Sequence, residues 1–193
     1  MKFLDKHSNT LTKFATVLSK IVEVAYAIGA LALAAALVLL IVYPSAKLPL
    51  FAPGEEFTIR GFTLVCGSPD GSVDRTAFGL VLLDGALTMI LMWWVFRNAY
   101  LILRTTQGLT KFSKGATPFQ KDNVRMLREI GIAFFAMTAV RFLISAVAVA
   151  VIGPARAEVS MELGEAIIGI LMLCLSQCFD QGVQMQQDVD GLV

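Results

Sequence analysis

Charged residues are scarce in this sequence, and their scarcity is the first clue to the class of protein. Only 16% of the 193 residues are charged and 56% are hydrophobic, with a mean hydropathy of +0.72. Soluble domains carry about 25% charged residues. A soluble fold of this length buries only about 70% of the surface that its unfolded chain exposes, too little to hide so much apolar surface. The composition therefore predicts an integral membrane protein and excludes a disordered chain.

Residues that build catalytic and metal centres are also few. His7 is the only histidine, so no histidine base is available inside a membrane segment. Cys66 stands alone, which favours a buried or incidental thiol over a redox site, and Cys174 and Cys178 lie one helical turn apart, where packing is favoured over zinc. Zinc-protease, serine-hydrolase and nucleotide-loop motifs are missing. We expect no enzymatic activity, no cofactor and no bound metal, and the net charge of +1 predicts no direct contact with nucleic acid.

Four long apolar segments are present instead. Each of the first three contains about the 20 residues needed to cross the hydrocarbon core of a bilayer, whereas the uncharged centre of the fourth, 166–179, is shorter. We predict an all-α fold, an integral membrane four-helix bundle formed by a single transmembrane domain over residues 1–193. The helices are expected at about 21–43, 77–103, 119–153 and 162–188.

The distribution of lysine and arginine predicts the topology. Eleven of these residues precede the first segment or lie between the second and third, whereas four lie in the other two connections. The positive-inside rule therefore puts both termini in the cytoplasm. We expect a multi-pass protein of the inner (cytoplasmic) membrane. The alternative that the first segment is a cleaved signal peptide is disfavoured, because its apolar run is long and no small-residue cleavage site follows.

Three connecting regions carry local signals. Apolar residues from Leu11 to Ile21 recur at helical spacing, which predicts a short N-terminal interfacial helix, with a frayed tail as the alternative. The outer loop, 44–76, contains β-forming residues at 57–65 that predict a small strand or hairpin. The cytoplasmic connection, 104–118, ends in a capping box that starts at Thr117 and predicts a new helix there.

Two charged residues fall deep inside the apolar segments. Asp84 and Arg141 lie at equal depth on consecutive helices, roughly 20 Å from the cytoplasmic charged ring at 1.5 Å per residue. A charge at the bilayer centre costs at least about 2.5–3.5 kcal/mol, so we expect the two to form an ion pair. Neighbouring hydroxyl groups extend this polar seam: Thr88, Thr138 and Ser145. The pair either fixes the helix register, which we favour, or forms a proton- or ligand-responsive site.

Other polar and small residues have ordinary interpretations. The boundary carboxylates Glu23, Glu165 and Asp180 are expected to be solvated. A stripe of small residues on the first segment permits close packing, either within the bundle or against a second copy in a homo-oligomer: Ala25, Gly29, Ala32 and Ala36. Trp93 and Trp94 lie where an interfacial aromatic belt is expected.

Two motifs resemble a known family. The segment 114–131, KGATPFQKDNVRMLREIG, and the segment 179–188, FDQGVQMQQD, resemble the two signatures of an uncharacterised bacterial membrane family, domain of unknown function 2975. Met185 stands where a leucine is common, and Gln186 and Gln187 replace some of the usual acidic residues. The resemblance implies a small four-helix membrane protein without enzymatic activity. Because family members are often encoded beside a small helix-turn-helix regulator, it also implies a role in membrane-linked regulation.

Two functions follow as expectations. The first is a non-enzymatic regulatory or scaffold component that engages a cytoplasmic partner, such as a helix-turn-helix transcription regulator, while embedded in the lipid bilayer. Its expected partner surface consists of residues from the basic connection and the C-terminal helix: Lys111, Lys114, Lys121, Arg125, Gln184 and Asp188. The basic residues of this surface are alternatively suited to anionic lipid. The second function is a small oligomeric channel or transporter that uses the Asp84/Arg141 seam.

Overall fold

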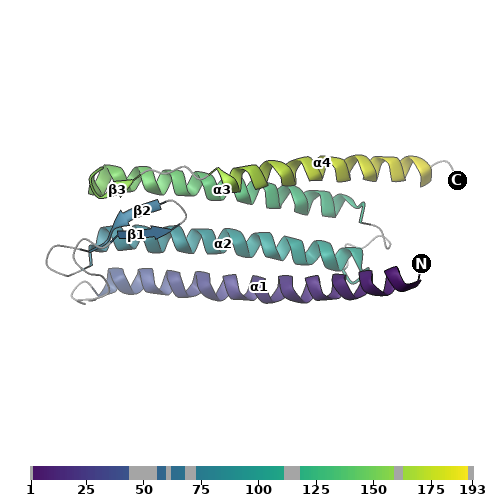
Figure 1. Ribbon diagram of the computed structural model, residues 1–193, viewed down its shortest axis with the longest axis horizontal. Coiled ribbons are helices and arrows are strands. Elements are labelled where there is room, and N and C mark those ends of the chain that lie inside the picture. Colours follow the sequence, from purple (N-terminus) through teal and green to yellow (C-terminus); the bar gives the residue numbers. More distant parts are fainter. Residues whose placement is uncertain are drawn as a thin grey trace. The chain divides into compact units, whose positions relative to one another are not determined.

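Four long helices dominate the computed structural model, which describes residues 2–43, 56–59, 62–67, 73–110, 118–158 and 163–190 (Figure 1). The helices have the following bounds: α1 Lys2–Val42, α2 Arg75–Thr106, α3 Lys121–Ile152 and α4 Gly164–Asp190. All four are long and apolar enough to cross a membrane. The predicted helical membrane fold is confirmed, and the chain is a multi-pass membrane protein.

Two compact units divide the chain. The first unit contains Met1–Tyr26, Leu91–Phe135 and Ala166–Val193, and the second contains Ala27–Ile90 and Ala136–Glu165. Both units therefore draw on several helices rather than on consecutive stretches of the chain.

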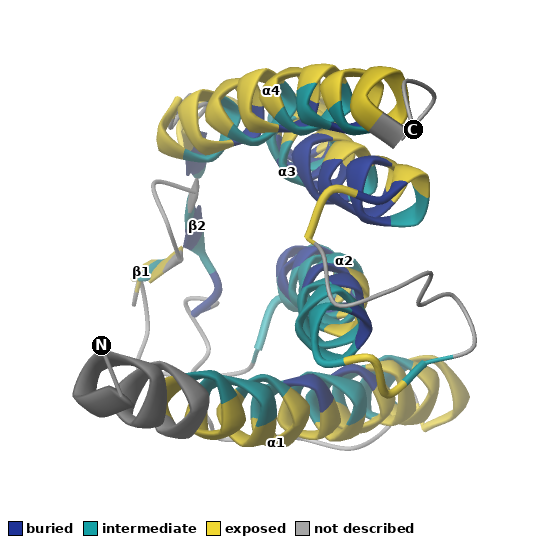
Figure 2. Ribbon diagram, turned by 90° about the vertical axis from the view of Figure 1, so that its right-hand side faces the viewer, coloured by how far each residue is buried: buried dark blue, intermediate teal, exposed yellow. Residues whose placement is uncertain are grey.

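The N-terminal amphipathic stretch is helical and continuous with the first apolar segment. The two form α1, which has 41 residues without a break. Large apolar side chains on this helix are exposed, among them Leu11 (69%), Phe14 (64%) and Leu31 (72%). Figure 2 shows this exposure along α1 and along α4. Exposed side chains of this size are expected on the lipid-facing side of a membrane helix.

The ends of the helices at the basic connection follow from local chemistry. Gly108, with φ of 72°, ends α2: its N–H bonds the carbonyl of Thr105, and the next N–H bonds that of Arg104. This hydrogen-bond pattern requires a left-handed residue, which glycine adopts without strain. Helix α3 begins at Lys121, and the Gln120 carbonyl accepts its first helical bond from Val124. The helix therefore begins two residues after the expected start at about 119, and the expected capping residue Thr117 lies outside the described residues.

A small antiparallel sheet lies in the second unit. Strands β1 (Glu56–Ile59) and β2 (Phe62–Val65) form the hairpin expected in the outer loop, and β3 (Ala157–Glu158) pairs with β2 on its other side. Strand β3 could not be predicted from the sequence, because two residues carry no strand pattern. Asp74 caps α2 through Oδ1 and binds Arg156 at 3.0 Å through Oδ2, which ties the connection after α3 to the start of α2.

The core of the second unit joins this sheet to two helices. Its buried residues come from the sheet region, from α2 and from α3: Leu64, Cys66, Ala77, Val81, Ile144, Ala148 and Ala157. The sheet therefore buries the apolar faces that α2 and α3 present at this end of the unit. Small residues bring α1 against α2 as well, because a Cβ on Gly29 would lie 3.3 Å from Met89 Sδ. At Gly29, the small-residue stripe therefore packs within the chain.

Helices α3 and α4 approach most closely in the first unit. A Cβ on Gly131 would lie 3.0 Å from the Gly169 carbonyl oxygen, and a Cβ on Gly169 would lie 3.0 Å from that of Gly131. Two glycines facing each other let the helix backbones come into contact, as small residues do in membrane helices. This crossing was not predicted from the sequence.

The Cys66 thiol is fully buried beside the sheet. Burial, with a smaller contribution from Asp74, raises the pKa of the thiol to about 11, while Arg156 opposes the shift. We expect the folded protein to keep Cys66 protonated, because its folded pKa lies above the ordinary value of 9.0. Its contribution to stability is then complete below pH 9 and is lost as the pH rises toward 11.

Maleimide labelling at neutral pH tests the state of this thiol. In a variant with Cys174→Ala and Cys178→Ala, Cys66 should react at least tenfold more slowly in the native protein than in denaturant, since the thiolate is the reactive form. Equal labelling rates in the two states would contradict the burial of Cys66.

Candidate functional site

The second unit buries a pair of opposite charges. Arg141, on α3, is 4% exposed, and its Nη1 lies 3.5 Å from Oε1 of Glu165 in the first turn of α4. The Glu165 side chain is itself only 12% exposed. The expectation that Glu165 is a solvated boundary carboxylate is therefore wrong. Since α4 begins opposite Arg141, eleven residues before α3 ends, its first turn lies beside α3 rather than level with its end.

Asp84 is buried in the same unit, with 2% of its surface exposed. Its predicted pairing with Arg141 is supported by the helix register. Val81 on α2 and Ile144 on α3 belong to one core cluster, and one turn further in, on the same faces, lie Asp84 and Arg141. This register is consistent with the pairing, which stays a prediction.

The hydroxyl residues of the predicted seam differ in their surroundings. Ser145 is fully buried, and its hydroxyl donates to the Phe142 carbonyl at 2.9 Å within α3. Thr88 and Thr138 are half-buried. The Ser145 hydroxyl therefore donates its hydrogen bond within α3 and not to the charged pair.

The first unit has a polar interior where its helices end. Asn98 on α2 is buried and donates to Glu129 Oε2 on α3 at 3.0 Å. Asn123, fully buried, donates to the Pro118 carbonyl at 2.9 Å, and the Thr105 and Thr110 hydroxyls lie 2.9 Å apart. These bonds hold the first turn of α3 and the last turn of α2 in defined positions. Sequence patterns did not reveal them, because single amides and hydroxyls carry no periodic signal.

The two family-like motifs meet in this unit. Phe119, just before α3, packs on Phe179 of α4 with ring centroids 5.4 Å apart, and a Cβ on Gly182 would lie 2.5 Å from the Phe119 ring. The absence of a side chain at Gly182 therefore leaves room for the Phe119 ring. Beyond it, α4 continues for eight residues to Asp190, about 12 Å at 1.5 Å per residue. We call residues 184–190, which follow the buried Val183, the α4 overhang.

The α4 overhang exposes large apolar side chains among polar ones. Met185 is 69% exposed and Val189 is 62% exposed, and the two lie four residues apart on one face. Gln184 and Asp188 are exposed beside them. The Phe119 contact brings this segment close to the start of α3.

The first turns of α3 carry an exposed basic face. Lys121, Arg125 and Arg128 are all exposed. The Arg125 guanidinium is partly balanced by Asp122 at 3.9 Å and by Glu129 at 3.6 Å, and its side chain is 60% exposed. Lys111 and Lys114, which were expected on the same surface, lie outside the described residues.

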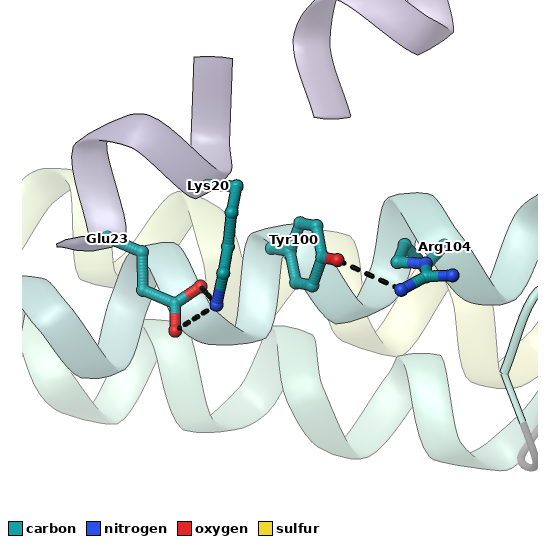
Figure 3. A network of polar contacts seen from close by, with 4 residues as sticks. All are labelled: Lys20, Glu23, Tyr100 and Arg104. Atoms are coloured by element: carbon teal, nitrogen blue, oxygen red, sulfur yellow. Dashed lines mark hydrogen bonds and ion pairs between the residues drawn. The ribbon is translucent and has the colours of Figure 1, made fainter. Parts of the chain in front are cut away.

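A second boundary carboxylate is buried rather than solvated. Glu23 is 7% exposed, and both of its oxygens accept hydrogen bonds from Lys20 Nζ at 2.9 Å (Figure 3). Asp180 is half-buried. The Lys20 amine therefore pairs with the buried Glu23 carboxylate from one turn away, and the sequence spacing alone did not indicate that burial.

Comparison with known proteins places this arrangement in a family. No group of three or more metal-ligating side chains occurs among the residues that the structure describes. No curated protein matches the chain, and no solved structure matches it. A family model described as a protein of unknown function (DUF2975) matches residues 73–193, which include α2, α3, α4 and both motifs. The chain therefore belongs to the DUF2975 family.

Proposed function

We propose that this protein is a non-enzymatic regulatory or scaffold component that holds a cytoplasmic partner at the end of its first unit. The α4 overhang carries this proposal. Met185 and Val189 are large, apolar and exposed, yet glutamine and aspartate surround them on the same two turns. Such a segment is too polar for the hydrocarbon core and too apolar to be a merely solvated helix end. An amphipathic helix end of this kind suits a hydrophobic groove on another protein.

The charge beside the overhang indicates the chemistry of that partner. Lys121, Arg125 and Arg128 present cations on the exposed face of α3. A partner with an apolar groove and an acidic rim would complement both features. A small helix-turn-helix regulator with such a groove is the partner that the family resemblance suggests. The lysine and arginine distribution supports a cytoplasmic location for this end, in the inner membrane of a bacterium.

Substitutions in the overhang test the proposal. The double variant Met185→Ser/Val189→Ser should weaken partner binding about tenfold or more, because each buried apolar side chain contributes about 1.5–3 kcal/mol. Lys121→Glu/Arg125→Glu should weaken it at low salt. Gln187→Ser, an exposed polar change in the same segment, is the matched control and should change little. Unchanged partner binding and unchanged transcript levels in both double variants would contradict the proposed function.

A second function, transport, draws support from one observation. Asp84, Arg141 and Glu165 place three ionisable side chains in the interior of the second unit. Buried ionisable groups in membrane helices frequently mark ion or substrate pathways. Flux in liposomes that is lost in Asp84→Asn would favour a small oligomeric channel or transporter. Absence of flux under varied ion gradients would count against it.

A further inference from the structure

Two cations meet on one tyrosine at the end of the first unit (Figure 3). Lys20 on α1 lies with its Nζ 5.0 Å from the centroid of the Tyr100 ring on α2. Arg104, one turn after Tyr100, donates from Nη1 to the Tyr100 hydroxyl oxygen at 3.0 Å, and its guanidinium lies 5.7 Å from the same ring centroid. Tyr100 therefore orients cationic groups that come from two different helices.

The charge of this cluster is positive after its internal pairing is counted. Glu23 neutralises Lys20 through the two 2.9 Å hydrogen bonds. In the described part of the chain, no carboxylate forms an ion pair with Arg104. Arg104 thus supplies one net positive charge, and the Lys20 side chain remains 48% exposed.

Unused hydrogen-bond donors point to an anionic ligand. The Tyr100 oxygen accepts from Arg104, so the hydroxyl keeps its own proton for donation. Lys20 has three N–H donors, of which Glu23 takes two. The guanidinium of Arg104 has five donors in a planar fork that matches the oxygen atoms of a phosphate. The neighbouring arginine and tyrosine donors suit a tetrahedral oxyanion, and the nearby lysine adds to the positive potential.

The position along α2 matches the depth of lipid phosphates. Arg97 lies 5.4 Å from the Trp93 ring centroid, and Trp94 is 44% exposed, as in an interfacial aromatic belt. Tyr100 follows Trp94 by six residues, about 9 Å along the helix. The headgroup layer lies just outside the hydrocarbon core at a similar distance.

We propose that Lys20, Tyr100 and Arg104 form a binding site for a phosphate group, supplied by the headgroup of an anionic phospholipid or by a free phosphate. In this site the Arg104 guanidinium and the Tyr100 hydroxyl donate to the phosphate oxygens, while Lys20, on the other side of the tyrosine ring (Figure 3), adds positive charge. Glu23 holds Lys20 in place over the tyrosine ring. The site ties α1 to α2 at the membrane surface and is separate from the α4 overhang.

Lipid titration of the purified full chain in mild detergent tests this site. Thermal stability and lipid retention in native mass spectrometry are measured with phosphatidylglycerol, phosphatidylcholine or inorganic phosphate. Phosphatidylglycerol should raise the midpoint of unfolding more than phosphatidylcholine does. Arg104→Gln should weaken phosphatidylglycerol binding about tenfold or more, since hydrogen bonds to charged groups are the strong ones. Tyr100→Phe, which keeps the ring and both cations, should weaken it less.

Matched controls separate the site from general charge. Lys13→Gln removes one exposed cation from α1 and should leave the preference for phosphatidylglycerol unchanged. If inorganic phosphate reproduces the stabilisation and competes with the lipid, the phosphate site stands and its ligand is a soluble phosphate. Equal stabilisation by the two lipids with no effect of phosphate, or full phosphatidylglycerol binding by both Arg104→Gln and Tyr100→Phe, would overturn the proposal. Tyr100→Phe keeps the test decisive if Arg104→Gln does not fold.

Discussion

Glu165→Gln should lower the free energy of unfolding by about 3–5 kcal/mol, the usual cost of removing one partner from a buried ion pair. Arg141 is 4% exposed, so the loss of the carboxylate leaves its guanidinium buried with one ionic partner fewer. Thermal unfolding of the purified protein in detergent measures the effect. Glu158→Gln is the matched control, because Glu158 is an exposed carboxylate on β3. Unchanged midpoints in both Glu165→Gln and Arg141→Met would contradict a stabilising pair.

Thermal unfolding also tests whether Asp84, like Glu165, interacts with Arg141. Asp84→Asn should lower stability, and the double-mutant cycle of Asp84→Asn with Arg141→Met should give a coupling energy above about 0.5 kcal/mol. Additive effects would show that Asp84 acts independently of Arg141. The cycle is informative because the predicted pairing is supported by helix register alone.

Adding side chains at the α3–α4 crossing should also lower the free energy of unfolding strongly. A Cβ on Gly131 or Gly169 would lie about 3.0 Å from the opposing carbonyl oxygen, and backbone cannot move aside as a side chain can. We expect Gly131→Val or Gly169→Val to cost about 3 kcal/mol, at the upper end for overpacking, because the helices must separate.

Alanine variants give a sharper comparison at the crossing. A Cβ on Gly164 would meet nothing within 4 Å, so Gly164→Ala is a matched control at the start of α4. It should be neutral or slightly stabilising, because alanine is a better helix former than glycine. Gly131→Ala and Gly169→Ala should destabilise. Equal unfolding midpoints for the three variants would contradict the close approach.

The parts of the fold that follow from composition and periodicity could be predicted from the sequence. Length and hydropathy determine the four helices, and the alternation of β-forming residues around Phe57 indicates the hairpin. The partners of individual side chains could not be predicted. Glu165 lies beside Arg141 because α4 starts partway along α3, and nothing in the sequence indicates that offset. The Gly131–Gly169 contact likewise depends on how two helices cross.

The proposed binding surfaces also contain some residues that the sequence identifies and others that only the structure brings together. The basic residues Lys121 and Arg125 could be identified by spacing, and the structure gives their exposure. The exposure of Met185 and Val189 and the packing of Phe119 against α4 are given only by the tertiary structure. Lys20 and Tyr100 are 80 residues apart in the sequence and meet only because α1 and α2 pack together.

Affinity purification from native membranes in mild detergent tests the central claim most directly. The full chain, the Met185→Ser/Val189→Ser variant and the Gln187→Ser control are isolated in parallel, and their associated proteins are quantified by mass spectrometry. We expect one soluble cytoplasmic protein in stoichiometric amount with the wild type and the control, and its loss from the double variant. Isolation of the wild-type chain without such a partner, or equal retention by the double variant, would contradict a partner-binding role of the α4 overhang.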